Sequence, residues 1–119
     1  MTLPIPSEEV EQRNFVQWLN IKGYKYTAIP NSTYTRSWSQ KRKNTETGLR
    51  AGFPDMVIIA DNIFMCIEMK RTKGGVLSMP QRSWLEALRF AGIPVAVCAG
   101  TEEAISFVKA TVASKATGA

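Results

Sequence analysis

The sequence predicts one α/β domain in which a central mixed β-sheet is flanked by helices. Two apolar runs on either side of Asp61-Asn62 have the pattern of an antiparallel hairpin with a two-residue loop. A helix and a further apolar strand follow the hairpin, which favours a β-α-β crossover and hence a parallel strand pair. The 119 residues, 45% of them hydrophobic, suffice for one core and are too few for two ordinary domains.

The individual elements follow from apolar periodicity and from the residues that start and stop helices. Predicted helices cover residues 7–22, 78–91 and 101–112, with Ser7, Ser78 and Thr101 as N-caps. Predicted strands cover residues 24–29, 55–60, 63–70 and 94–99. We expect an ordered core over about residues 7–112 and a frayed tail over residues 113–119, which are small and polar.

The first predicted helix carries acidic residues beside its apolar arc, which consists of Phe15, Val16, Trp18 and Leu19. At about 100° per residue, Glu8 falls at the middle of the arc, Glu11 near one edge and Glu9 well away from it. Glu8 can simply complement the helix dipole, and Glu11 can be a flanking residue. A carboxylate on the core-facing arc can also reach the end of an underlying sheet, and the helical geometry favours Glu8 for this position.

In the predicted hairpin, Asp55 lies directly opposite Glu68, because the numbers of cross-strand partners around this loop sum to 123. Opposed Cβ atoms lie about 4.5 to 5.5 Å apart, and two negative charges at that distance repel by roughly 3 kcal/mol at an effective dielectric near 20. Lys70 shares the face of the two carboxylates. Both faces of the hairpin are apolar, so we expect it to be central and buried.

Two interpretations of this carboxylate pair are open. In the structural one, Asp55 is only a turn residue after Pro54, and Glu68 forms an ion pair with Lys70. In the functional one, the two carboxylates share a divalent cation, because Mg²⁺ prefers hard oxygen ligands and often takes only one or two protein carboxylates. A bound cation would cancel the repulsion between them.

The absence of histidine excludes several kinds of active site. Neither a Ser-His-Asp triad, a Cys-His pair nor a His-ligated zinc centre can be built. Cys66 and Cys98 lie in apolar runs without metal-ligand spacing, which indicates buried thiols rather than a zinc site or a disulfide. Catalysis would therefore depend on carboxylates, lysine and a hard metal ion. No secretion signal or membrane-spanning run is apparent, so we expect a soluble cytoplasmic protein.

The longest polar stretch, residues 31–50, has a net charge of +4 within a chain of net charge +5. Its charges are interleaved with Tyr34 and Trp38, a combination that suits a groove for phosphates and stacked bases. A solvated loop with incidental charge is the alternative. The candidate DNA-binding residues are Arg36, Trp38, Lys41, Arg42, Lys43 and Arg50, together with Lys73 in the loop after the hairpin.

Four motifs follow one another along the chain: S-E-E-V-E-Q at 7–12, G-F-P-D at 52–55, E-M-K at 68–70 and S-M-P-Q at 78–81. Their arrangement resembles the PD-(D/E)XK nuclease superfamily, and specifically the VRR-NUC family in its short, stand-alone phage and bacterial form. The resemblance extends from Ser7 to about Val112, and its specificity comes from the conjunction of the motifs. It implies a PD-(D/E)XK nuclease-like fold.

The resemblance also implies a cofactor and its ligands. Asp55, Glu68 and the main-chain carbonyl of Met69 would bind Mg²⁺ or Mn²⁺. A glutamate of the first helix would help to organise the metal or its waters, and both Glu8 and Glu11 fit the pattern of the family. Further candidates for the catalytic machinery are Lys70, which would orient or activate the attacking water, and Gln81, which would hold water or Lys70.

The activity implied by the resemblance is metal-dependent hydrolysis of DNA phosphodiesters by an endonuclease selective for branched structures. Four-way (Holliday) junctions are the leading substrate, in phage or bacterial DNA replication or repair within the host cytoplasm. Since so small a chain cannot readily clamp both cuts of a junction, we expect a homodimer. The alternatives are a non-catalytic nucleic-acid-binding accessory module with the same fold, and a small structural domain whose basic loop is incidental.

Overall fold

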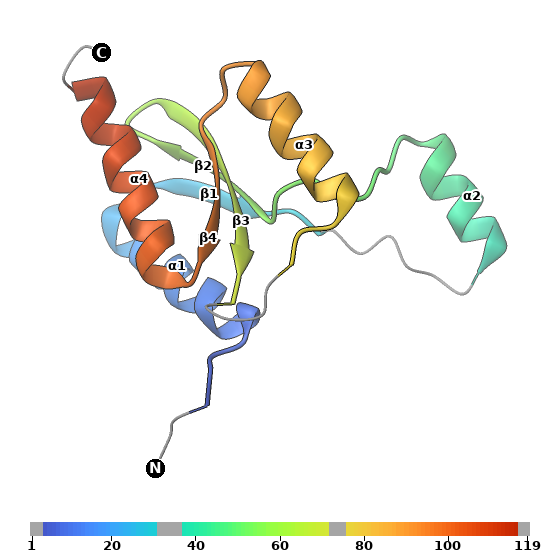
Figure 1. Ribbon diagram of the computed structural model, residues 1–119, viewed down its shortest axis with the longest axis horizontal. Coiled ribbons are helices and arrows are strands. Elements are labelled where there is room, and N and C mark those ends of the chain that lie inside the picture. Colours follow the sequence, from blue (N-terminus) through green and yellow to red (C-terminus); the bar gives the residue numbers. More distant parts are fainter. Residues whose placement is uncertain (1–3, 31–36, 72–75, 117–119) are drawn as a thin grey trace.

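The computed structural model describes residues 4–30, 37–71 and 76–116. In this part of the chain, four helices and four strands follow one another, and Figure 1 shows their arrangement. The helices are α1 (Glu8–Lys22), α2 (Trp38–Glu46), α3 (Met79–Phe90) and α4 (Thr101–Ala116). The strands are β1 (Lys25–Ala28), β2 (Met56–Ala60), β3 (Ile63–Lys70) and β4 (Val95–Ala99). All elements predicted from the sequence are present, with ends that differ by a few residues at most.

The four strands form one mixed sheet in the order β1-β2-β3-β4. The pairs β1-β2 and β2-β3 are antiparallel, whereas β3 and β4 are parallel and are joined through α3. The crossover and the mixed sheet predicted from the sequence are therefore confirmed. Because β2 and β3 occupy the middle of the sheet, the hairpin that carries the candidate carboxylates is central, as expected.

The hairpin loop consists of Asp61 and Asn62, and both residues have positive φ, at 49° and 67°. This is the conformation of a type I′ turn, which matches the twist of the strands and favours Asn and Asp. The pairs Met56↔Ile67 and Ala60↔Ile63 show the predicted register, in which partner numbers sum to 123. The loop thus determines which residues of the two strands face each other.

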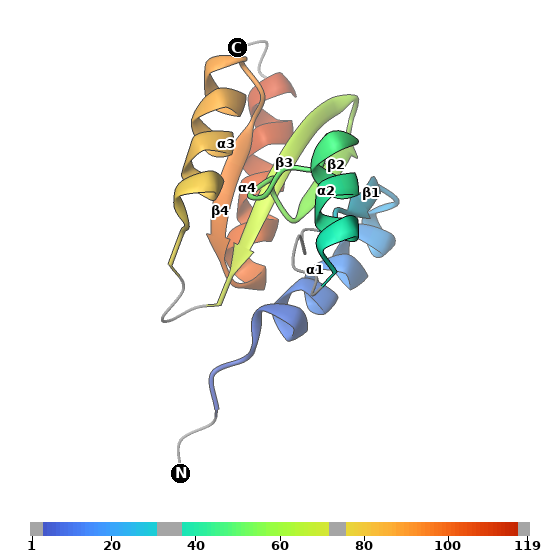
Figure 2. The same ribbon diagram turned by 90° about the vertical axis from the view of Figure 1, so that its right-hand side faces the viewer.

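One face of the sheet is covered by α1 and α4, and the other is covered in part by α3 (Figure 2). The larger core lies beneath α1 and α4 and contains Phe15, Leu19, Met56, Ile58, Met65, Ile67, Met69, Ala104 and Val108. A smaller cluster joins Leu85 of α3 to Cys66 and Val95. Successive residues of the hairpin contribute to opposite clusters, as the period of a strand requires.

The expectation that both faces of the hairpin are buried is wrong near its turn. Ile59 and Phe64 are 46% and 43% exposed. The reason is that α3 packs against β4 and leaves the part of this face over β1 and β2 without a covering helix. The hairpin is therefore buried more completely on the side of α1 and α4.

Helix α2 was not predicted, since residues 31–50 were interpreted as a polar stretch. Ser37 caps this helix by accepting a hydrogen bond from the main-chain N–H of Gln40 at 3.2 Å. The helix stands apart from the sheet and the other helices in Figure 1, and none of its nine residues is buried.

The last helix, α4, is longer than predicted. It continues to Ala116, so residues 113–116 of the expected frayed tail are helical and residues 117–119 lie outside the described part. Within the described ranges, no helix has the length and apolar character needed to cross a membrane.

Candidate active site

Asp55 and Glu68 meet where β2 begins and β3 ends. Asp55 directly precedes β2, and continuing the register of the hairpin by one residue places it opposite Glu68. Its carboxylate accepts a hydrogen bond from the main-chain N–H of Met69 at 2.8 Å, and its main-chain carbonyl accepts one from Ile29 at 2.7 Å. Asp55 is therefore fixed between β1 and β3 and is more than a turn residue.

Glu68 is 1% exposed, although its side chain ends in a carboxyl group. The pKa of Glu68 is raised to about 9, chiefly by burial and also by the hydrogen bond with Asp55 and the charge of Asp55, while Lys70 and Gln81 act in the opposite direction. Two carboxylates cannot both be ionised in so dry a position without compensation. The pair requires a shared proton or a cation.

Lys70 ends β3 and is half-buried. Its positive charge lowers the pKa of Glu68, but no ion pair joins these two described residues. The structural interpretation, in which Glu68 is present to form an ion pair with Lys70, therefore has no support in the geometry. Lys70 is available to an external group near the carboxylates.

Gln81 makes two side-chain hydrogen bonds in the structure. Its side-chain oxygen accepts a hydrogen bond from the main-chain N–H of Ser78 at 2.8 Å, which completes a capping box at the start of α3. Its amide nitrogen donates to Oε1 of Glu68 at 2.8 Å. The amide thus holds Glu68, whereas the expected role was to hold water or Lys70.

Gly52 explains why the chain before Asp55 can lie so close to α3. A Cβ atom on this residue would lie 2.5 Å from the carbonyl carbon of Pro80 and 2.7 Å from the main-chain nitrogen of Gln81. Gly52 also has φ of +98°, which favours glycine. Beside it, the indole N–H of Trp84 donates to the carbonyl of Ala51 at 3.1 Å. These contacts position the start of α3, and with it Gln81, relative to Asp55.

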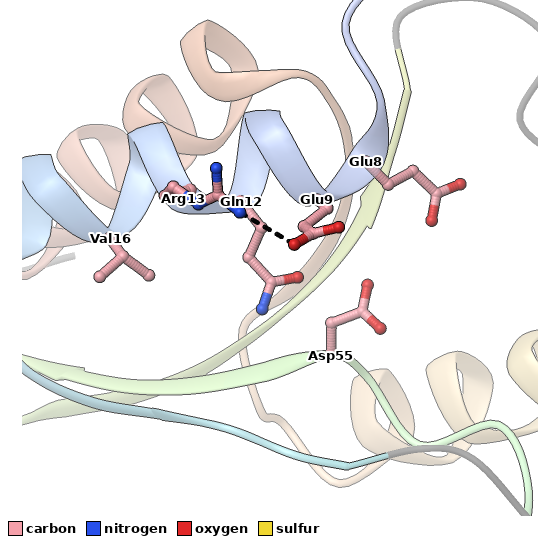
Figure 3. Close-up of a pocket in the computed structure, with 6 residues that line it drawn as sticks. All are labelled: Glu8, Glu9, Gln12, Arg13, Val16 and Asp55. Carbon is pink, nitrogen blue, oxygen red and sulfur yellow. Dashed lines mark hydrogen bonds and ion pairs between the residues drawn. The ribbon is translucent and has the colours of Figure 1, made fainter.

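On the other side of Asp55, the first turns of α1 form a cleft of about 450 Å³ (Figure 3). Its lining consists of Glu8, Glu9, Gln12, Arg13, Val16 and Asp55. In Figure 3 the carboxylates of Glu8 and Asp55 point into the same space between the helix and the sheet. Glu9 is engaged in an ion pair of 2.9 Å with Arg13, which leaves Glu8 as the helix carboxylate that faces Asp55.

Glu11 lies outside the cleft and is buried, so it is not the flanking residue that one interpretation of the sequence allowed. Its carboxylate accepts hydrogen bonds from the main-chain N–H and the hydroxyl of Thr101. The burial of Glu11 could not be predicted from the sequence, because it depends on where α4 begins. Of the two candidate glutamates, the structure brings only Glu8 into the cleft with Asp55.

Gln12 is a site residue that the sequence analysis missed. It is partly exposed and lines the cleft together with Glu8 and Asp55. The four-residue spacing from Glu8 would have indicated it, because residues i and i+4 of a helix share a face. Its amide offers a neutral donor and acceptor beside the carboxylates.

The described candidate DNA-binding residues lie on α2 and shortly after it. Trp38, Lys41, Arg42 and Lys43 are all exposed, and the Lys41 ammonium lies 5.1 Å from the ring centroid of Trp38. The guanidinium of Arg50 donates to the main-chain carbonyls of Thr45 and Leu49 at 3.2 and 3.0 Å. Arg36 and Lys73 lie outside the described residues.

The donor set fits a hard divalent cation. Asp55 and Glu68 supply two opposed carboxylates, one of them buried, and Glu8 supplies a third from across the cleft. In the described ranges, no three His, Cys, Asp or Glu side chains form a ready-made cage for an ion. Mg²⁺ is usually bound by one or two carboxylates plus water and substrate phosphate, so Asp55 and Glu68 are sufficient protein ligands for such an ion.

The fold and the opposed carboxylates define a nuclease-like α/β domain of the PD-(D/E)XK type. The VRR-NUC domain model matches residues 6–102, and the chain belongs to this family. Family membership implies a nuclease-like function. It confirms the resemblance inferred from the four motifs.

Solved structures of similar fold carry the same family name. One, called "VRR_NUC domain protein", is 21% identical, with a TM-score of 0.70 over 89% of this chain and 88% of that chain. Another, called "VRR_NUC domain", is 17% identical, with a TM-score of 0.63 over 86% of this chain and 94% of that chain. No match is found among curated proteins.

Proposed function

We propose that this protein is a metal-dependent endonuclease that hydrolyses phosphodiester bonds in DNA. The observation that carries the proposal is the pairing of Asp55 with a Glu68 that is 1% exposed. A purely structural or DNA-binding domain gains nothing from two mutually repelling carboxylates in a dry position. A metal site that meets a phosphate at the protein surface explains both the pairing and the burial.

Asp55 and Glu68 are the residues that would hold Mg²⁺ or Mn²⁺, with the main-chain carbonyl of Met69 as a further ligand. When bound, the ion would polarise the phosphoryl oxygen and lower the pKa of a bound water. Gln81 fixes the Glu68 carboxylate through its amide N–H. Glu8 and Gln12 present one acceptor group and one donor group to water in the cleft.

Lys70 would stabilise the negative charge that develops on the scissile phosphate and orient the attacking water. Its place as the last residue of β3 puts its ammonium near the carboxylates, as the effect of its charge on the pKa of Glu68 indicates. A positioned cation in a partly buried site stabilises a developing oxyanion more than it would in water.

The substrate that we propose is branched DNA, with four-way junctions as the leading candidate, in phage or bacterial DNA replication or repair. A junction requires two cuts related by symmetry, which a homodimer with two sites provides. We therefore expect a dimer, and light scattering at micromolar concentration tests it. A strict monomer would argue against the junction as substrate.

The proposal is tested by cleavage of a labelled four-way junction, a matched linear duplex, a flap and a single strand, in Mg²⁺, Mn²⁺ or EDTA. Asp55→Asn and Glu68→Gln should each abolish metal-dependent cutting while binding is kept or strengthened, because a negative site becomes neutral. Glu86→Gln, at an exposed glutamate of α3, is the matched control and should cut normally. Metal-independent binding without cutting by the wild type would favour the accessory module instead.

A further inference from the structure

Trp38 opens α2 and is 81% exposed. The ammonium of Lys41, one turn further along the helix, lies 5.1 Å from its ring centroid. An indole on a solvated surface is unusual, because it is the largest apolar side chain and is usually at least partly covered. No residue of α2 is buried, so this ring is not part of any core in the domain.

The helix itself needs a partner. Isolated helices shorter than about 12 to 15 residues are marginal in water, and most helical stability comes from packing of an apolar face. Helix α2 has nine residues and no buried face. Helix α2 is polar and lies apart from the sheet and the other helices. This indicates that another molecule binds to its surface.

Charge identifies the class of that molecule. Residues 37–50 contain four Lys or Arg and one Glu, which gives this segment a net charge of +3. The same segment of a second copy would carry the same charge of +3, so two such segments would repel each other rather than pair. A polyanion that also offers flat apolar rings fits both the charges and the indole, and a nucleic acid with accessible bases is such a molecule.

The segment is anchored close to the candidate active site. Directly after it, the carbonyl of Ala51 accepts the Trp84 indole N–H, and Gly52 lies against the main chain of Pro80 and Gln81. Gln81 in turn donates to Glu68. DNA bound by α2 would therefore be tethered close to the carboxylates.

We propose that Trp38 stacks on an unpaired base and so makes the protein selective for DNA in which bases are unstacked beside a duplex. Lys41, Arg42 and Lys43 neutralise the neighbouring phosphates. In continuous duplex the base faces are already stacked, and exposing one costs a few kcal/mol. This inference rests on the proposed function, because it specifies which DNA reaches the carboxylate site.

The test is equilibrium binding in EDTA, measured by fluorescence anisotropy, so that no cutting occurs. The two probes are a labelled duplex with a three-nucleotide single-stranded gap and the same duplex without the gap. Base–aromatic stacking contributes about 1–3 kcal/mol, so Trp38→Ala should weaken binding of the gapped probe roughly 5- to 150-fold. Binding of the continuous duplex should be almost unchanged, and Trp38→Phe should restore part of the preference.

Phe90→Ala is the matched control, since Phe90 is also an exposed aromatic residue, at 97%, but lies at the end of α3. It should leave both affinities unchanged. Equal losses on both probes, or no loss on either, would overturn the inference. So would conversion of a dimer to a monomer by Trp38→Ala in light scattering, which would make α2 a contact between copies.

The outcome is distinguishable from that of the proposed function. A wild type that prefers the gapped probe through Trp38 but cuts no DNA would leave this inference standing and remove the nuclease. If the wild type cuts DNA and Trp38→Ala does not change its substrate preference, the proposed nuclease stands and this inference is wrong.

Discussion

The carboxylate of Glu11 accepts hydrogen bonds from the main-chain N–H and the hydroxyl of Thr101, the first residue of α4. The same hydroxyl lies 3.0 Å from the main-chain carbonyl of Glu11. A carboxylate at a helix N-terminus is stabilised by the helix dipole and by unpaired N–H groups. Glu11 thus joins α1 to α4, and its neighbour one turn earlier, Glu8, is directed to the cleft.

The two glutamates should therefore respond differently to the same change. Glu11→Gln removes a charged acceptor from a buried hydrogen-bonded position and should lower the free energy of unfolding by about 1–3 kcal/mol. Glu8→Gln should leave stability unchanged and lower the cleavage rate about 10- to 100-fold, the typical effect of losing a group that orients metal-bound water. Urea denaturation and single-turnover cleavage measure the two effects. If Glu8→Gln lowered stability and Glu11→Gln lowered the cleavage rate instead, the assignment of Glu11 to structure and Glu8 to the active site would be wrong.

The raised pKa of Glu68 predicts how the metal-free protein responds to pH. The folded state keeps a proton on Glu68 up to a pKa of about 9, whereas the unfolded chain loses it near 4.5. Between these values the folded state binds more protons, so the stability that Glu68 contributes is fully present below about pH 4.5 and is lost as the pH rises toward 9. Thermal denaturation in EDTA from pH 5 to 9 should show this decline. Glu68→Gln should flatten it, and an equal decline in the variant would contradict the assignment.

Gln81 can be tested with two substitutions that separate its two hydrogen bonds. Gln81→Glu keeps an acceptor suited to a capping box but replaces the amide donor with a carboxylate beside Glu68. We expect this variant to have nearly normal stability at acidic pH and to lose most of its cutting activity. The added carboxylate should also make the site bind protons more tightly. Gln81→Ala removes both bonds and should also lower the free energy of unfolding by about 1 kcal/mol through the lost cap. Equal cutting by wild type and Gln81→Glu would show that the amide donor is dispensable.

Gly52 and Gly48 provide a matched pair, because their φ values are +98° and +99°. Alanine at Gly48 meets no atom within 4 Å, so Gly48→Ala should show only the backbone penalty, about 1 kcal/mol or somewhat more. Gly52→Ala should lose a further 1–3 kcal/mol or so from overlap with the main chain of α3. It should also impair cutting, since α3 must move away and take Gln81 with it. Urea denaturation compares the two, and equal losses would mean that the close approach is unimportant.

The parts of the fold that could be predicted depend on short-range signals. Asp61-Asn62 predicted the hairpin and its register, because the two-residue loop fixes both. Ser7 and Ser78 predicted the starts of α1 and α3, because capping acts within one turn. The pairing of Asp55 with Glu68 followed from the register.

The features that could not be predicted depend on contacts between distant parts of the chain. Glu11 and Thr101 are 90 residues apart, and no local pattern indicates that one caps the helix begun by the other. Helix α2 has no apolar periodicity, which is the main signal for a helix. The exposure of Ile59 and Phe64 depends on how far α3 extends across the sheet, and a strand pattern carries no information on that.

The hairpin loop also has a consequence for the order of events during folding. Hairpins form in about 1–10 μs, and a two-residue loop brings Asp55 and Glu68 together without help from distant segments. At that stage both carboxylates are in water, where their repulsion is weak and screened. Only later do α1 and α3 close over them and remove the water.

The electrostatic barrier should therefore lie late on the folding pathway, when the pair loses its hydration. We expect folding of the hairpin to be indifferent to divalent cations and docking of the helices to be accelerated by them. The residues that would bind metal in the finished protein would then also make metal a participant in its assembly.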